Sequence, residues 1–144
     1  MTLNQISAFV ENQPGKLQLL TDALAKNNIN LRALSLAETT EFGIVRIIVD
    51  DVDAAAAVLK EEGVVYTVTK VLGVSLPDAP GGLNQVLHIL SQGGVNIEYM
   101  YAFLGGKETA HAYMIFHVHD TDAAMAVLAN AGVACIAQSD LANL

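Results

Sequence analysis

The chain has 144 residues, of which 53% are hydrophobic and 15% are charged, so it can bury a core and is not a disordered chain. Its 15 acidic residues outnumber 7 lysines and arginines, and the net charge of −8 argues against binding to nucleic acids or anionic membranes. We expect a cytoplasmic protein, because no apolar run reaches about 20 residues, no signal peptide is evident, and Cys135 is the only cysteine.

The first half of the chain has the patterns of six elements in the order β-α-β-β-α-β. Alternation of apolar residues marks the strands, an apolar stripe marks the first helix, and Pro14-Gly15 marks the turn before that helix. In chain order the expected elements are a strand at 3–10, a helix from 15 to 27, a hairpin whose second strand is 44–49, a helix from about 51 to 62, and a strand at 65–69. Asp51 or Asp53 is expected to cap the second helix.

The second half repeats the first. Asn12-Gln13-Pro14-Gly15-Lys16-Leu17 returns as Asp78-Ala79-Pro80-Gly81-Gly82-Leu83, 66 residues later, and Asn30 returns as Asn96. Further on the offset becomes 69, so the second repeat has three extra residues, which we place in the turn 104–107. The same six elements are therefore expected again, with strands at 71–76, 112–118 and 134–137 and helices ending near Gly93-Gly94 and Gly132.

This order of elements predicts an α+β protein of two tandem ferredoxin-like modules, each an antiparallel sheet with two helices on one face. The first module is expected at 1–69 and the second at 70–144. Residues 67–71 leave almost no linker between them.

Alternation along the third strands sorts their side chains into two faces. Val45, Ile47 and Val49 should face the helices, as should Met114, Phe116 and Val118. The opposite, open face then carries apolar residues that water would not tolerate. The members of this open face are Phe9, Ile44, Arg46, Ile48, Val71, Tyr113, Ile115 and His117. Either a homodimer forms over it, which we expect, or the two repeats cover each other's faces.

The turn before each first helix has the chemistry of a binding site for a free amino acid. Backbone N–H groups at a helix N-terminus attract a carboxylate, and Gly15 and Gly81 allow close approach. Asn12 and Asp78 can accept hydrogen bonds from an ammonium group, and Asn30 and Asn96 could present groups nearby. The alternative is a plain turn in which Asn12 or Asp78 caps the helix.

These motifs resemble those of the ACT domain, a regulatory amino-acid-binding module, and the chain resembles stand-alone proteins made of two such modules. The resemblance implies the βαββαβ fold and ligands bound at interfaces between modules. It implies two candidate sites, which we describe as the loop of each repeat with the start of its second strand. The candidate residues are Asn12, Gln13, Pro14, Gly15, Lys16, Leu17, Asn30 and Leu31 in the first repeat, and Asp78, Ala79, Pro80, Gly81, Gly82, Leu83, Asn96 and Ile97 in the second.

Other polar and aromatic residues have a structural and a functional interpretation. Arg32 either clamps a ligand carboxylate or pairs with a neighbour such as Glu38. Tyr99, Tyr101 and Phe103 could line a pocket or belong to a core or interface. The pair His117 and His119 could hold a metal, but the first repeat has no counterpart, so we expect none.

The sequence therefore predicts an amino-acid sensor that acts on a regulated enzyme partner, without a cofactor and without catalysis of its own. Catalytic motifs such as G-x-S-x-G and the phosphate loop are missing. The alternative is a ligand-free interaction module that docks another protein through the open sheet face.

Overall fold

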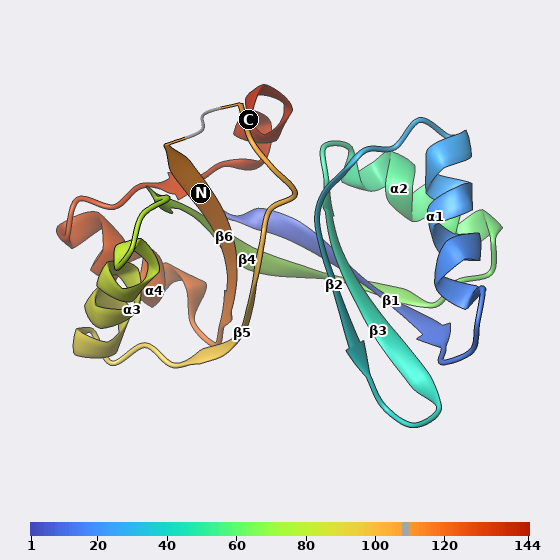
Figure 1. The fold of residues 1–144 in the computed structure, drawn as a ribbon, viewed down its shortest axis with the longest axis horizontal. Coiled ribbons are helices and arrows are strands. Elements are labelled where there is room, and N and C mark those ends of the chain that lie inside the picture. The colour runs from blue at the N-terminus through green and yellow to red at the C-terminus, as the bar shows by residue number, and fades with distance from the viewer. Residues whose placement is uncertain (108–109) are drawn as a thin grey trace. The chain divides into compact units, whose positions relative to one another are not determined.

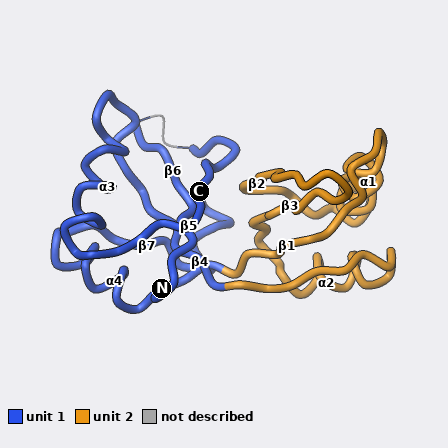
Figure 2. The backbone as a smooth tube through the Cα atoms, turned by 90° about the horizontal axis from the view of Figure 1, so that it is seen from below, with its two compact units in different colours: residues 1–3, 70–144 blue, residues 4–69 orange. Residues whose placement is uncertain are grey.

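A computed structural model describes residues 1–107 and 110–144, and the chain divides into two compact units (Figures 1 and 2). Unit 2 comprises residues 4–69, and unit 1 comprises residues 1–3 and 70–144. The elements in chain order are β1 (Leu3–Glu11), α1 (Lys16–Lys26), β2 (Leu31–Glu38), β3 (Phe42–Val49), α2 (Val52–Glu61), β4 (Tyr66–Pro77), α3 (Gly82–Gln92), β5 (Ile97–Ala102), β6 (His111–Val118), α4 (Thr121–Asn130), β7 (Cys135–Ile136) and the 3-10 helix η1 (Gln138–Asn143).

Both units have the expected α+β architecture. In unit 2 the strand order is β2-β3-β1-β4, with β3 antiparallel to both of its neighbours. In unit 1 the order is β5-β6-β4-β7, so β4 takes the place that β1 has in unit 2. Figure 1 shows α1 and α2 on one face of the first sheet, and α3 and α4 on one face of the second. Each unit is therefore a ferredoxin-like βαββαβ module.

Local sequence signals explain where the helices begin. Asp51 and Asp120 precede α2 and α4, and their carboxylates accept hydrogen bonds from the N–H groups of Ala54 and Ala123 at 2.9 and 3.0 Å. These caps satisfy N–H groups that the helix leaves unpaired. The capping role expected for Asp51 is thus confirmed.

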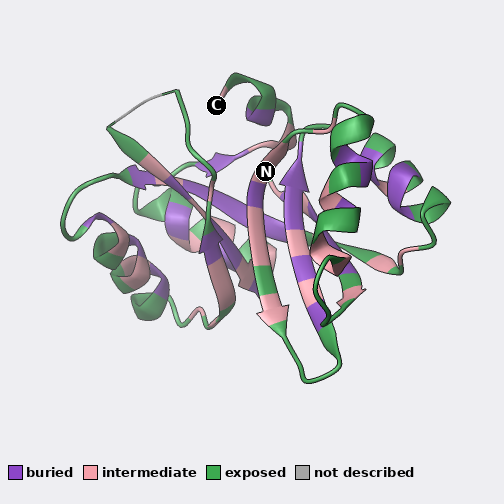
Figure 3. Ribbon diagram, turned by 45° about the vertical axis from the view of Figure 1, so that its right-hand side comes forward, coloured by how far each residue is buried: buried purple, intermediate pink, exposed green. Residues whose placement is uncertain are grey.

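Each unit has its own apolar core between its helices and its sheet. In unit 2 the core includes Leu20 and Leu24 of α1 and Val45, Ile47 and Val49 of β3. The core of unit 1 contains the counterparts on α3 and β6, including Val86, Leu90, Phe116 and Val118, and Met114 packs against it. Figure 3 shows this burial as purple on the inner sides of the helices. The sorting of the third strands toward the helices is confirmed.

Three boundaries differ from the sequence analysis. Residues 1–3 belong to unit 1, because Leu3 is fully buried and reaches Gly73, and the N-terminal amino group contacts the sulfur of Met125 at 3.4 Å. The strands expected at 65–69 and 71–76 form one continuous strand, β4. The strand expected at 134–137 is only two residues long, and η1 follows it unexpectedly.

The open face of the sheets does not present the apolar surface that alternation suggested. Ile48, Val71 and Ile115 are fully buried in the chain, and Tyr113 is nearly so. The expectation that this face needs a second copy to shield it is therefore wrong for these residues. Among the described residues, no helix is both long and apolar enough to span a membrane.

Candidate ligand-binding site

The turn between β1 and α1 is fixed by backbone hydrogen bonds on both sides. The N–H of Asn12 donates to the carbonyl of Glu41 at 3.0 Å, and the Asn12 side-chain amide donates to the carbonyl of Thr39 at 3.2 Å. Both acceptors lie in the β2–β3 hairpin. Asn12 therefore ties the turn to the hairpin and does not cap α1, so the capping alternative is wrong for this residue.

The helix starts behind this turn at a glycine in the left-handed conformation. Gly15 has φ of 85°, and Gly81 in unit 1 has the same value, a backbone that residues with a Cβ rarely adopt. Neither helix has a side-chain cap at this end. Among the described residues, the N–H groups of Leu17 and Gln18 have no acceptor. Together with the helix dipole, such groups can hold a carboxylate.

A pocket lies between this turn and the hairpin in each unit. In unit 2 it has a volume of about 300 Å³, and its walls include Asn12, Gln13, Leu17, Leu36 and Gly43. In unit 1 it has a volume of about 260 Å³ and is lined by Asp78, Ala102, Phe103, His111, Ala112 and Tyr113, among others. Three of the lining positions are equivalent in the two repeats: Asn12 and Asp78, Leu36 and Ala102, Gly43 and Ala112. Each repeat thus has a pocket beside its first turn, and the two pockets share these three lining positions.

Both pockets have carboxylate side chains among their lining residues. Glu11 and Glu38 line the pocket of unit 2, and Glu11 also meets Lys16 at 3.9 Å. In unit 1 the acid is Asp78, whose carboxylate has no partner among the described residues, while its N–H donates to the carbonyl of Ala110 at 2.9 Å. The pocket of unit 2 therefore has the free N–H of Leu17 on one wall and carboxylates on another, whereas the pocket of unit 1 has the carboxylate of Asp78 but no residue from the start of α3 on its walls.

The residues 1–144 match the family described as an ACT domain pair. The chain belongs to the ACT domain pair family. A crystal structure of protein BT0572 from Bacteroides thetaiotaomicron is similar over 100% of this chain and 98% of that protein, with 42% identity and a TM-score of 0.91.

Two more distant structures show a likeness of fold alone. The ligand-free regulatory subunit of aspartate kinase from Thermus thermophilus has 17% identity and a TM-score of 0.62, over 90% of this chain and 92% of that subunit. The same subunit from Thermus flavus has 18% identity and a TM-score of 0.57, over 92% and 94% of the two chains. No curated protein sequence matches the chain.

The candidate strand starts lie far from the loops within each ACT module. Glu11, which precedes the turn, pairs with Phe42 of β3, whereas Leu31 pairs with Val49, seven residues along the same strand. At about 3.4 Å per residue these levels are about 24 Å apart. Asp78 and Ile97 are separated in the same way along β6. The expectation that Asn30 and Asn96 present groups near the loops of their own repeat is wrong.

The remaining candidates of the ACT loops have distinct places. Pro14, Ala79 and Pro80 belong to the turns, and Lys16 begins α1 on the side away from the pocket of unit 2. Gly82 begins α3 so close to the backbone carbonyl of Pro77 that no side chain would fit there. Leu83 packs against the core of unit 1.

Arg32 forms an ion pair with Asp50 and not with Glu38, the neighbour considered from the sequence. Its guanidinium donates two hydrogen bonds of 2.9 Å to the carboxylate of Asp50, and this bond raises the pKa of Arg32. The pairing follows from the register, because Leu31 pairs with Val49 next to both residues. Arg32 therefore has a structural role within its ACT module.

The aromatic residues of unit 1 divide between two environments. Tyr99 stacks on Tyr101 and on His117, with ring centroids 6.5 and 4.7 Å apart, and His117 also contacts Glu98 at 2.6 Å. Phe103 instead packs against Tyr113, 5.8 Å between centroids, on the wall of the ligand pocket. In residues 1–107 and 110–144, no three metal-ligating side chains form a cluster.

Sequence reasoning missed the hairpin side of each ACT pocket. Leu36, Glu38 and Gly43 in unit 2, and Tyr113 in unit 1, complete the walls, and Phe103, which the sequence analysis considered as a pocket residue, lies there too. Only the fold shows that the hairpin returns to the turn.

Proposed function

We propose that this ACT domain pair is a regulatory protein that binds a free amino acid in the pockets beside the β1–α1 and β4–α3 turns. The observation that carries the proposal is a pocket beside the equivalent turn in each of two diverged repeats. Surface turns usually vary between related sequences, so a pocket at the same place in both repeats favours a shared role. Volumes near 300 Å³ lie at the lower end of the range for small-ligand pockets.

The chemistry of the walls suggests how an amino acid would lie. In unit 2 the ligand carboxylate would accept hydrogen bonds from the N–H groups of Leu17 and Gln18, and its ammonium group would face Glu11 or Glu38. In unit 1 Asp78 would bind the ammonium group, with Phe103 and Tyr113 beside the ligand side chain. The two pockets therefore favour different side chains, since one wall is aliphatic and the other aromatic.

The residues at the starts of β2 and β5 can contact a ligand only in a neighbouring module. Because Leu31 and Ile97 lie about 24 Å from the loop of their own unit, they could contact a ligand only at the loop of a different module. A homodimer and a regulated enzyme remain the expected partners. Binding would act by favouring one assembly over another through differential affinity.

The test is a thermal-shift screen of the full chain against free amino acids, followed by calorimetric titration of any ligand found. A ligand that binds only the folded state raises the melting temperature. Asp78→Asn should weaken binding in unit 1 by about tenfold or more, because it removes a charge-assisted hydrogen bond worth about 1.5–3 kcal/mol. Asn96→Ala is the matched control at the far end of the same unit.

Two results would contradict the proposed binding of an amino acid at the loops. If no amino acid at millimolar concentration shifts the melting temperature, the proposed ligand class is wrong. If a ligand binds and Asn96→Ala abolishes binding while Asp78→Asn does not, the site lies at the strand starts and not at the loops.

A further inference from the structure

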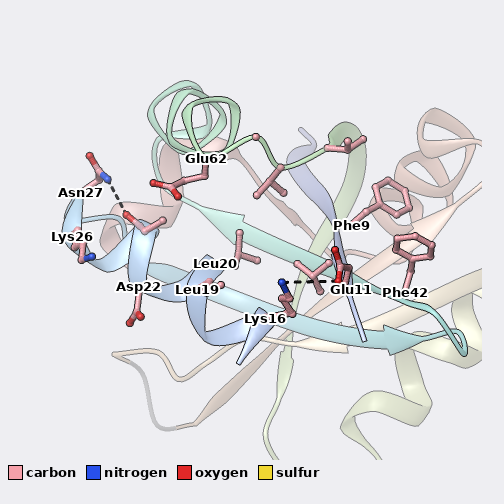
Figure 4. Close-up of a pocket in the computed structure, with 15 residues that line it drawn as sticks. Phe9, Glu11, Lys16, Leu19, Leu20, Asp22, Lys26, Asn27, Phe42 and Glu62 are labelled. Carbon is pink, nitrogen blue, oxygen red and sulfur yellow. Dashed lines mark hydrogen bonds and ion pairs between the residues drawn. The ribbon is translucent and has the colours of Figure 1, made fainter. Parts of the chain in front are cut away.

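The ligand pocket of unit 2 has two carboxylates on its walls, and a neutral amino acid has only one ammonium group to offer them. Glu11 ends β1, and Figure 4 shows its carboxylate facing Lys16 at the start of α1, 3.9 Å away. Glu38 ends β2 on the hairpin side of the pocket, and its carboxylate has no partner among the described residues. A carboxylate left without a counter-charge beside a bound ligand favours a second cation there.

The floor of the pocket, between the two strands that carry these acids, is a residue without a side chain. Val10 and Glu38 both pair with Gly43, so the three residues form one row across β1, β3 and β2. Gly43 shares the face of Val45, two residues along β3, which packs in the core beneath the helices. The φ of Gly43 is not positive, so the backbone conformation does not require glycine. Glycine inside a strand often marks close approach of a ligand.

The space above Gly43 has apolar walls. A Cβ at this position would lie 3.0 Å from Cδ1 of Leu36 and 3.4 Å from Cγ2 of Val10, so a larger residue would narrow the pocket. Leu36 lines the pocket and is 54% exposed, and Leu17 forms the wall at the start of α1. Lysine and arginine bury their apolar stems along such surfaces while the charged end reaches a polar group.

The second repeat shows that the fold does not require these features. In order, the residues equivalent to Glu11, Glu38 and Gly43 are Pro77, Leu104 and Ala112. Unit 1 has the same architecture without an acid at either position and with a methyl group in place of the open floor. The two acids and the glycine are therefore specific to unit 2, and they have no general role in forming the module.

We propose that the pocket of unit 2 binds an amino acid whose side chain is long and positively charged, such as arginine or lysine. The α-carboxylate lies at the start of α1, and the α-ammonium group faces Glu11. The apolar stem crosses Gly43 between Val10 and Leu36. The cationic end of the side chain meets the carboxylate of Glu38. This inference rests on the proposed function and adds the class of side chain that the pocket selects.

The test compares pairs of ligands that differ in side-chain charge and little in shape. Calorimetric titration of the Asp78→Asn chain, in which the site of unit 1 is weakened, measures the affinities for arginine and for citrulline, its neutral analogue. Lysine and norleucine form a second pair. Each cationic ligand should bind about tenfold more tightly than its neutral partner, because the neutral side chain leaves the Glu38 carboxylate without a charged donor.

Two variants assign this preference to Glu38. Glu38→Gln should bring the ratio of arginine to citrulline affinity close to one. Glu41→Gln is the matched control, because Glu41 lies in the same hairpin, undergoes the same change of charge and does not line the pocket, so the ratio should stay as it is. Circular dichroism confirms that both variants fold.

A third variant tests the path of the apolar stem. Gly43→Ala places a methyl group on the floor of the pocket, as Ala112 does in unit 1, so the variant is expected to fold. It should weaken arginine and citrulline alike, by about fivefold or more, because both stems cross this position. Unchanged affinity for both ligands would contradict the placement of the stem over Gly43.

The inference is overturned if citrulline and norleucine bind as tightly as arginine and lysine, or if Glu38→Gln keeps the preference for the cation. A neutral amino acid that binds at the loop without such a preference would leave the proposed function intact. If no amino acid binds the wild-type chain, both proposals fail together.

Discussion

Gly82→Ala should destabilise unit 1 even though alanine is the better helix former. Gly82 begins α3, and a Cβ there would overlap the carbonyl oxygen of Pro77 and also meet a methyl group of Leu76. The backbone of the turn would have to shift to make room. The equivalent residue of α1 is Lys16, a side chain that unit 2 accommodates in the same turn.

The magnitude follows from two opposing effects. Gly→Ala at an unstrained position stabilises a protein by about 0.4–1 kcal/mol through the unfolded chain. Forcing an additional carbon into a packed site costs about 1–3 kcal/mol. Because the overlap is with backbone and not with a flexible side chain, we expect the cost to dominate, with a net loss of about 1 kcal/mol. For a unit of this size that loss lowers the melting temperature by about 4–8 °C.

The assay is urea unfolding of the full chain followed by circular dichroism. Lys16→Ala is the matched control, because it removes an exposed side chain and should change stability by less than about 0.5 kcal/mol. If Gly82→Ala is as stable as the wild-type chain or more so, helix propensity outweighs the overlap. Steric exclusion by the Pro77 carbonyl would then be refuted as the reason for glycine at this position.

Two further predictions concern single side chains. Asp51→Ala and Asp120→Ala should each lower the free energy of unfolding by about 1 kcal/mol, since each removes an N-cap. Asp53→Ala, which caps no helix, should lower it by less in the same urea titration. Burial raises the pKa of the Cys135 thiol, so it stays protonated near pH 8 and should react slowly with a disulfide reagent until urea unfolds the chain. Equal rates in the folded and unfolded chain would contradict that burial.

The parts of the fold that the sequence predicted are those set by local physics. Apolar periodicity placed the strands and helices, and Asp51 was recognisable as a cap because the chemistry lies within three residues. Internal repetition identified the loops, because two copies reveal which residues a common fold retains.

The errors concern residues whose neighbours are set by strand register. Proximity in the sequence favours Glu38 as the partner of Arg32, but the antiparallel pairing of β2 with β3 brings Asp50 beside it. The motif spacing likewise favours Asn30 near the first loop, although α1 carries the chain back along the sheet before β2 begins. The order and pairing of the strands separate these residues in space. The spacing of the motifs in the sequence does not reveal that order.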